Sequence, residues 1–444
     1  MKTDLVGSRS PRGMIYLLVE ESAREMQARV LIAIHAARLG FEVLIGPQWA
    51  LVEQAARIPK GAVLFKGNNR IQVDNMGLMR AHGHAVASIE EEVLGLISEE
   101  RIVEQYDPRI GDVCDLLLCQ GDFQRACLNR AFPAFRGAIE TTGNPRLDLL
   151  RAPLNARTLR AADTIRAERG PFILINSNYS SINPRHGDTL TNFRGWVQAG
   201  FVDLGNPTDV EEYFDFCGWE RQNLHALLGF LKDAGMTRLA GRMILRPHPA
   251  EAAWRWHAGL SNVGEVEIVE EGDHLAWIAA STLLVHTSCT TGMEAAILGS
   301  AAINLDAASG PRSRDFGCYV ANPRVADPRE AVAIAQAHLD NPDPTPATPA
   351  PSEALATHWC LEETSAAEKI AVCLGDLCRN KRLDDGDLLA LGDVSLASWQ
   401  NQKFTLDPAV VQGYLTDFLS LLAIPETVTL EDLPGSSLLL RAGR

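Results

Sequence analysis

The sequence lacks several features that assign a chain to a common class of protein. No CxxC pair occurs among its nine cysteines, whose odd number and scattered positions indicate neither a zinc site nor a disulfide framework. No apolar stretch approaches the roughly 20 residues that span a bilayer. Positive charge is also scarce. The 41 Lys and Arg residues stand against 56 Asp and Glu, a formal net charge of −15, which argues against general binding of nucleic acid.

Composition and length indicate a large folded protein. The hydrophobic fraction of 46% and the charged fraction of 22% are ordinary for globular chains. At about 100–200 residues per domain, 444 residues predict two or three domains. Residues 1–11 are polar and the apolar run 14–19 is too short for a signal peptide, so we expect a cytoplasmic protein.

Short apolar runs alternate with helical patterns throughout residues 14–305. This alternation is typical of α/β domains with parallel sheets. In the first half, the runs that predict strands are 14–19, 41–45, 62–65, 84–89 and 114–119. In the second half, they are 172–175, 243–245, 266–269, 282–286 and 301–305. We therefore predict two Rossmann-like α/β domains that face each other across a cleft and are joined near residues 140–170.

The expected boundaries follow from this pattern. Residues 1–150 form the first domain, on the acceptor side, and residues 151–340 form the second, nucleotide-binding domain. Residues 341–444 form a Pro-rich connector and a helical C-terminal extension, with helices expected at 353–380 and near 408–422. We expect the last twenty or so residues to be a loosely packed tail.

Arg246-Pro247-His248-Pro249 follows the strand at 243–245. Ligands bind at the carboxyl ends of strands in open α/β sheets, and two prolines stiffen this loop. A guanidinium and an imidazole there suit a phosphate, and Glu251 can orient the imidazole or cap the next helix. The alternative is a stiff strand exit with its arginine on the surface.

A second pattern follows the strand at 282–286, where four of the next five residues, Thr287 to Thr291, carry hydroxyl groups. Ser288, Thr290, Thr291 and Gly292 precede a helix whose free N–H groups can bind an anion, and Glu294 can accept hydrogen bonds from a ribose. The alternative is an ordinary helix cap.

Together, these two loops predict a pocket for a nucleotide monophosphate or diphosphate. Asn176 and Asn178, after the strand at 172–175, would add hydrogen bonds to a sugar or phosphate, or simply form turns. There is no Walker A loop, no GxGxxG after the first strand, and no DxD pair after any predicted strand of the second half. Because the histidines are also isolated, we expect no metal and no cofactor beyond the nucleotide-linked substrate.

The first half supplies acids at its strand ends. Glu20 and Glu21 end the first strand, and Glu90-Glu91-Glu92 follows the strand at 84–89. Carboxylates that face a cleft serve as general bases or nucleophiles, although a run of three glutamates is also typical of a solvated helix start.

Several segments resemble the bacterial surface carbohydrate biosynthesis proteins, GT-B-like transferases related to capsule Kdo transferases and CDP-glycerol glycerophosphotransferases. The matching segments are "IYLLVEESARE" (15–25), "TGNPRLDLL" (142–150), "ILINSNYSSINP" (173–184), "RPHPAE" (246–251) and "SCTTGMEA" (288–295). "TGNPRLDLL" and "RPHP" are also similar to segments of UDP-sugar 2-epimerases.

This resemblance implies a GT-B-like fold whose second domain holds the donor nucleotide. Arg246 and His248 would meet its phosphate, and Ser288, Thr290, Thr291 and Gly292 would line the phosphate loop, with Glu294 near the ribose. The family's acidic element, similar to "DEEG", stands here as Glu90-Glu91-Glu92-Val93. Its departure from the family pattern leaves the catalytic acid among Glu91 (foremost), Glu92 and Glu20, with His248 opposite.

The implied function is transfer of a sugar, for example a Kdo-type acid from a CMP-sugar, onto a glycan or lipid-linked glycan acceptor of surface polysaccharide synthesis. A lipid-linked acceptor is compatible with peripheral contact at the cytoplasmic face of the inner membrane. Three alternatives stay open: a CDP-alcohol-dependent polyol-phosphate transferase, a UDP-sugar 2-epimerase, and a non-catalytic relative that binds nucleotide or glycan.

Overall fold

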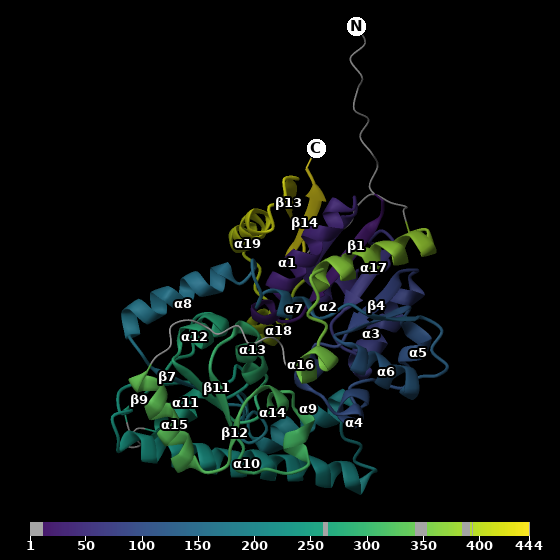
Figure 1. Ribbon diagram of the computed structural model, residues 1–444. Helices are drawn as coiled ribbons and strands as arrows, with labels where there is room; N and C mark the ends of the chain where they lie inside the picture. The colour runs from purple at the N-terminus through teal and green to yellow at the C-terminus, as the bar shows by residue number, and fades with distance from the viewer. Residues whose placement is uncertain (1–11, 261–264, 342–352, 384–390, 393, 444) are drawn as a thin grey trace.

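The chain folds around two separate sheets (Figure 1). The computed structural model describes all residues except 1–11, 261–264, 342–352, 384–390, 393 and 444. The first sheet has the strand order β13-β14-β2-β1-β3-β4-β5-β6. Its strands are β1 (Met14–Val19), β2 (Glu42–Pro47), β3 (Gly61–Phe65), β4 (Ala85–Ile89), β5 (Leu116–Cys119), β6 (Ala138–Thr141), β13 (Val428–Leu433) and β14 (Ser437–Ala442). The strands β1 to β6 are parallel.

The second sheet is parallel throughout, in the order β12-β11-β10-β7-β8-β9. Its strands are β7 (Ile173–Asn176), β8 (Met243–Arg246), β9 (Val266–Ile268), β10 (Leu283–His286), β11 (Ala302–Leu305) and β12 (Arg324–Val325). Each apolar run expected to form a strand in this half does so. The predicted α/β class, with a mainly parallel sheet in each half of the chain, is confirmed.

Helices connect the strands of each sheet. Those of the first domain are α1 (Ser22–Arg38), α2 (Gln48–Glu53), α3 (Arg70–Ala81), the 3-10 helix η1 (Glu92–Gly95), α4 (Glu99–Val103), α5 (Ile110–Val113), α6 (Asp122–Ala131) and α7 (Pro145–Asp148). Those of the second are α8 (Ala156–Arg169), α9 (Thr189–Ala199), α10 (Pro207–Gly235), α11 (Ala253–Leu260), α12 (His274–Ala280), α13 (Thr290–Leu298), η2 (Arg312–Asp315), α14 (Cys318–Ala321) and α15 (Pro328–Asp340). Among the described residues, no helix combines the length and the apolar character needed to cross a membrane.

The C-terminal segment returns to the first domain, where Figure 1 shows α17, α19 and the final hairpin beside α1 and β1. Its helices are α16 (Glu353–His358), α17 (Ala366–Lys381), α18 (Ser398–Lys403) and α19 (Pro408–Leu421). Most of the Pro-rich connector expected before them, from residue 342 to residue 352, lies outside the described residues. Covered by α17 and α19, helix α1 is buried on nearly every face, which explains its apolar sequence from Val30 to Ala37.

The expectation of a loosely packed tail is wrong. β14 pairs antiparallel with β2, so that Leu439 lies opposite Leu44, and β13 closes the edge as a hairpin. Without β14, the β2 backbone would present unpaired N–H and C=O groups at the edge of the sheet. Ser437 to Leu440 are accordingly buried.

Candidate active site

A cavity of about 1120 Å³ lies between the two domains. Carboxyl ends of parallel strands form one edge of each sheet, and ligands of α/β proteins bind at such edges. Here, Glu20 follows β1, Lys66 follows β3, Glu90 follows β4 and His248 follows β8. The first domain lines the cavity chiefly with charged side chains, whereas the second adds the aromatic side chains of α9, α10 and the turn between them.

Glu90 lines this cavity with a buried carboxyl group. It accepts hydrogen bonds from the amide of Asn68 (3.0 Å) and from the N–H of Glu92 (3.2 Å). Burial, and then repulsion by the charge of Glu92, raises its pKa to about 8. Glu90 therefore changes charge near neutral pH. It was not among the candidate acids chosen from the sequence, because its burial could not be read from a run of three glutamates.

Glu92 is the exposed member of the run and was a predicted catalytic residue. About half of its side chain (52%) is accessible, and its carboxylate lies 3.5 Å from the guanidinium of Arg24. Desolvation alone would raise its pKa, but the charges of Arg24, Lys66 and Arg146 outweigh it and hold the pKa below its ordinary value. Glu92 thus stays ionised beside a neighbour, Glu90, that is mostly protonated at neutral pH.

Glu91, the foremost sequence candidate, does not line the cavity. It is buried and lies 3.4 Å from Arg29, within hydrogen-bond reach of Asn144 (3.5 Å) and 4.0 Å from Arg146. Glu91 therefore belongs to a buried cluster of charged groups. Its neighbours in the run, Glu90 and Glu92, line the cavity instead.

Glu20, another predicted acid, lines the cavity between two lysines. Its carboxylate lies 3.1 Å from Lys66 and 3.4 Å from Lys403 of α18. Although desolvation opposes it, the attraction of these two charges lowers the pKa of Glu20. The C-terminal segment therefore contributes a charge to the cavity.

His248 projects from the second domain into the same cavity. Its Nδ1 accepts a hydrogen bond from the N–H of Ala250 (3.1 Å), so the neutral ring carries its proton on Nε2. Burial and then the charge of Arg24 lower its pKa to about 4. At neutral pH, His248 is an uncharged hydrogen-bond donor on the wall opposite the carboxylates.

Arg246 and Glu251, predicted donor-binding residues, make contacts within their own domain. Arg246 donates to the carbonyl groups of Glu271 and Gly272, lies 5.5 Å from the ring of Trp277, and has its pKa lowered by burial to about 10. Glu251 accepts hydrogen bonds from Ser177, Tyr179, Asn183 and Trp256. These bonds fix the loop after β8 and thereby place His248.

The two predicted asparagines, one at the end of β7 and one after it, do not line the cavity. Asn176 is buried at the end of β7, and its Oδ1 atom has no hydrogen-bond partner in the described part of the chain. Asn178 is half-buried. Their predicted contact with sugar or phosphate stays a prediction.

The loop before α13 is held by internal contacts. The hydroxyl group of Thr287 donates to Tyr179 (2.8 Å), and the N–H of Ser288, whose φ is +47°, donates to Asn304 (2.9 Å). A Cβ on Gly292 would lie 2.2 Å from His286, so only glycine allows this close approach. Thr290 abuts Gly95 of the first domain, and Thr291 follows it in the first turn of α13. The loop therefore lies at the junction of the domains, outside the cavity wall.

Glu294 lies at the centre of an interdomain ion cluster. Its carboxylate contacts Arg146 of the first domain (3.2 Å) and His274 of the second (3.1 Å). Desolvation raises its pKa, but His274 and Arg146 more than offset this and bring the pKa to about 2. A ribose would have to compete with these partners for the carboxylate.

This low pKa predicts a pH-dependent contribution to stability. Because the folded pKa of Glu294 lies below its ordinary value of 4.5, its contribution is present above pH 4.5 and lost as the pH falls toward 2. Glu294→Gln should lower the free energy of unfolding by about 3 kcal/mol at pH 7. In denaturant titrations, the difference from wild type should shrink below pH 4.5. A difference that does not change with pH would contradict the predicted contribution of the Glu294 carboxylate.

Glu267→Gln, at the exposed ion pair with Arg169, is the matched control and should change stability by less than about 1 kcal/mol.

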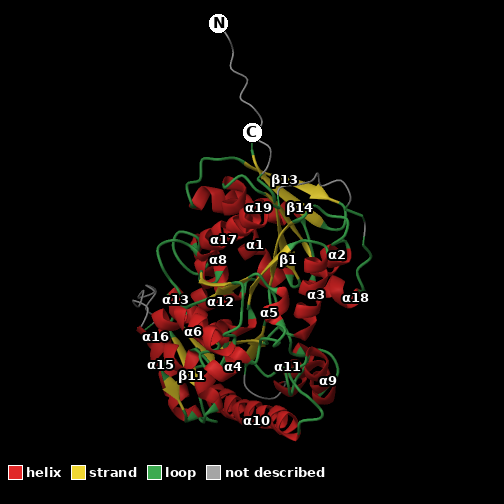
Figure 2. Cartoon of the chain, turned by 90° about the vertical axis from the view of Figure 1, so that its right-hand side faces the viewer, coloured by secondary structure: helices red, strands yellow, loops and turns green. Residues whose placement is uncertain are grey.

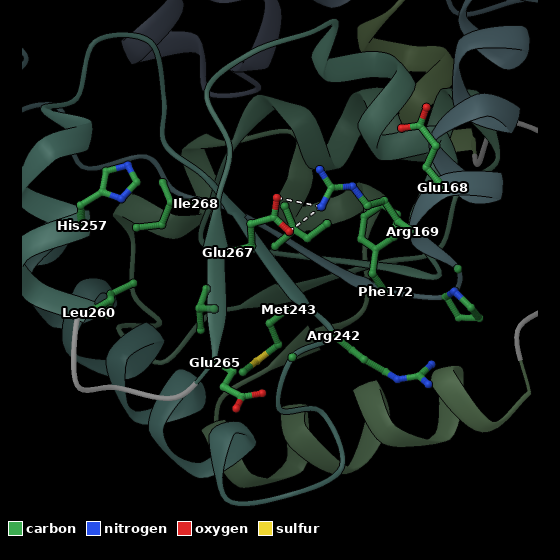
Figure 3. Close-up of a pocket in the computed structure, with 15 residues that line it drawn as sticks. Glu168, Arg169, Phe172, Arg242, Met243, His257, Leu260, Glu265, Glu267 and Ile268 are labelled. Carbon is green, nitrogen blue, oxygen red and sulfur yellow. Dashed lines mark hydrogen bonds and ion pairs between the residues drawn. The ribbon is translucent and has the colours of Figure 1, made fainter.

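A second hollow of about 830 Å³ lies at the opposite edge of the second sheet (Figure 3). It is formed around the amino ends of β7, β8 and β9, and Figure 3 shows Arg169 paired with Glu267 in it. None of the predicted site residues lines this hollow. Within the part of the chain that is described, no three His, Cys, Asp or Glu side chains converge to hold a metal ion.

No known sequence family and no curated protein sequence matches the chain. Solved structures do have a similar arrangement. UDP-GlcNAc 2-epimerase from Methanocaldococcus jannaschii, bound to UDP-GlcNAc and UDP, is 14% identical over 81% of this chain and 98% of its own, with a TM-score of 0.47. MnaA from S. aureus, bound to UDP, is 10% identical over 84% and 97%, with a TM-score of 0.46. The wall teichoic acid polymerase TagF is 10% identical over 84% and 90%, with a TM-score of 0.44. Likeness at this level assigns no role to a residue.

Proposed function

We propose that the chain is a metal-independent glycosyltransferase of surface polysaccharide synthesis, which moves a sugar from a nucleotide donor to a glycan or lipid-linked glycan acceptor. The observation that carries the proposal is the set of groups in the interdomain cavity: Glu90 with a pKa of about 8, ionised Glu92, and neutral His248 opposite them. Neighbouring groups whose pKa values are driven apart are a common sign of acid–base catalysis.

The three groups suit the parts of such a reaction. Glu90 titrates near neutral pH and is the base that takes the proton from the acceptor hydroxyl group. Glu92, held ionised by Arg24, stabilises the positive charge that develops on the donor sugar as its bond to phosphate breaks. His248 Nε2–H, Arg24 and Lys66 stabilise the negative charge that builds on the departing phosphate, a task for which positioned donors and cations suffice.

The first test is a thermal-shift panel of CMP, CDP, UMP, UDP, GDP and ADP in the presence of EDTA. A nucleotide that binds only the folded chain stabilises it by about 2.7 kcal/mol at a hundredfold excess over Kd, so a clear rise in Tm is expected for at least one base. His248→Ala should reduce that rise. No shift with any nucleotide, with or without magnesium, would contradict the proposal.

Turnover assays separate the alternatives. Release of nucleotide that depends on an acceptor supports the transferase. Conversion of a UDP-sugar without an acceptor indicates a 2-epimerase, and phosphorus in the glycan product indicates a polyol-phosphate transferase. Nucleotide binding with no turnover on any donor indicates a non-catalytic relative. A CMP-linked Kdo-type sugar is the first donor to assay, and peripheral contact with a membrane stays a prediction.

A further inference from the structure

Part of the interdomain cavity is formed by aromatic side chains that the proposed chemistry does not use. Trp196 of α9, Phe201 of the following turn and Phe216 of α10 all line the cavity and are half-buried. The ring of Trp196 lies 5.9 Å from that of Phe201 and 5.8 Å from that of Phe216. We name these three residues the aromatic wall. Figure 2 shows α9 beside α10 at the bottom of the molecule, away from the first sheet.

Further aromatic side chains pack against the aromatic wall and hold its rings in place. Tyr213 contacts Trp196 edge-on at 5.3 Å, and its hydroxyl group is bonded to Thr189 and Asn192. Phe216 stacks on Trp219, which stacks on Phe316 at 5.5 Å. The rings facing the cavity are therefore fixed before any ligand arrives, so binding to them costs little side-chain entropy.

A cation without a carboxylate partner lies against this wall. Arg312 of η2 lines the cavity, and its guanidinium is 5.3 Å from the ring of Phe216. Within the described part of the chain, its guanidinium donates to the carbonyl group of Glu212 (3.3 Å), and no described carboxylate lies within 4 Å of it. Two of the acids near it are engaged elsewhere, because Arg101 of the first domain pairs with Glu212 (3.2 Å) and Asp315 (3.4 Å), and Asp215 acts on Arg312 only as a nearby charge.

We propose that the aromatic wall and Arg312 form the acceptor subsite, and that this subsite takes a pyranose bearing an anionic group, a carboxylate or a phosphate. The acceptor would then be held by the second domain, not by the first as the sequence pattern led us to expect. This inference rests on the proposed transferase function. The C–H face of a pyranose packs on an aromatic ring, and the guanidinium forms charge-assisted hydrogen bonds with the anion. The donor phosphate has its own groups, His248, Arg24 and Lys66, which lie at strand ends and on α1.

The proposal is tested on the full chain without donor, by ligand-observed NMR titration. The probes are methyl β-glucuronide, which carries a carboxylate, glucose 6-phosphate, which carries a phosphate, and neutral methyl β-glucoside. One of the anionic probes should bind at least about tenfold tighter than the neutral glucoside, and which one does so identifies the anion. Equal affinity for all three, or no binding, would overturn the proposal.

Two variants with matched controls locate the binding. Arg312→Gln should remove the preference for the anionic probe and leave the affinity for methyl glucoside unchanged, whereas Arg312→Lys should restore part of the preference. Arg157→Gln is the control, since Arg157 lies 4.7 Å from the ring of Tyr414 and does not line the cavity. Trp196→Ala should weaken all sugar binding about tenfold, and Trp254→Ala, at an exposed side chain of α11, should not. If Arg312→Gln still prefers the anionic probe over methyl glucoside, the proposal is overturned.

Failure of this inference differs from failure of the proposed function. A nucleotide thermal shift without binding of any anionic sugar leaves the transferase proposal in place and removes the subsite. If instead a nucleotide displaces the sugar probes and Trp196→Ala abolishes the nucleotide thermal shift, the aromatic wall holds the donor base and the acceptor subsite is refuted.

Discussion

Replacement of Glu90 by glutamine is expected to lower kcat by about 10²–10⁴-fold, the usual contribution of a general base, while the nucleotide thermal shift is retained. Glutamine keeps the shape of the side chain, and its Oε1 can still accept from the N–H of Glu92. Its NH2 group replaces the oxygen that accepts from Asn68, and it can donate to Oδ1 of Asn68 if that amide turns over. It cannot take a proton. The loss therefore falls on the chemical step and leaves binding and folding largely intact.

The pH dependence of kcat/KM shows whether Glu90 acts as a base or as an acid. In the free enzyme, the base must be ionised, so kcat/KM should rise with pH and level off above the Glu90 pKa of about 8. Steady-state rates of nucleotide release between pH 6 and 9.5 measure this. A profile that falls through pH 8 would assign Glu90 as a proton donor and contradict its role as the base.

Glu220 provides a matched control for this experiment. It is also a buried glutamate whose pKa burial raises to about 8, and it accepts from the N–H groups of Ser181 and Ile182. It does not line the cavity. Glu220→Gln should therefore retain both kcat and the pH profile. Equal losses in the two variants would show that removal of any such buried acid disturbs the fold.

The positions of the strand ends were predictable, and with them the set of residues near the cavity. Apolar runs ending in polar residues placed Glu20, Glu90 and His248 at the carboxyl ends of parallel strands, where both sheets meet. The signal is strong because a fully buried parallel strand is a short, nearly continuous apolar run.

The direction of individual side chains was not predictable. Glu90, Glu91 and Glu92 are chemically identical, and their roles are separated by Asn68, Arg29 and Arg24, which lie on other elements. In the same way, Arg246 turns toward carbonyl groups 25 and 26 residues later in the chain, whereas His248, two positions on, faces the cavity. Such contacts depend on tertiary packing, which local sequence does not encode.

Contacts between segments that are distant in the sequence account for the remaining differences between the predicted and the observed structure. The sequence predicted one helix over 353–380, but the structure has α16 and α17 with Trp359 between them. Neither the return of β14 to β2 nor the reach of Lys403 to Glu20 has a local signal, because both join residues more than 380 positions apart. The aromatic side chains of α9 and α10 look like an ordinary apolar helix face until the cavity beside them is known.

Trp359→Ala is expected to lower the free energy of unfolding by about 3–5 kcal/mol, the second large effect predicted here. Trp359 is completely buried at the junction of the two domains. Its Nε1–H donates to the carbonyl group of Leu94 in the first domain (2.8 Å), and a Cβ on Gly317 of the second domain would lie only 2.3 Å from its ring. Removal of the indole leaves a cavity between the domains and an unpaired carbonyl group.

Urea unfolding followed by circular dichroism measures this effect, with the first transition compared because a two-domain chain need not unfold in one step. Trp359→Phe separates the hydrogen bond from the packing, and its smaller loss should reflect mainly the missing donor, about 1–3 kcal/mol. Trp254→Ala, at a side chain that is 65% exposed, should change stability by no more than about 0.5 kcal/mol. An equally small change in Trp359→Ala would show that the C-terminal segment does not hold the domains together. The cavity geometry would then be maintained by direct contacts between the domains, such as Arg146–Glu294 and Arg101–Asp315.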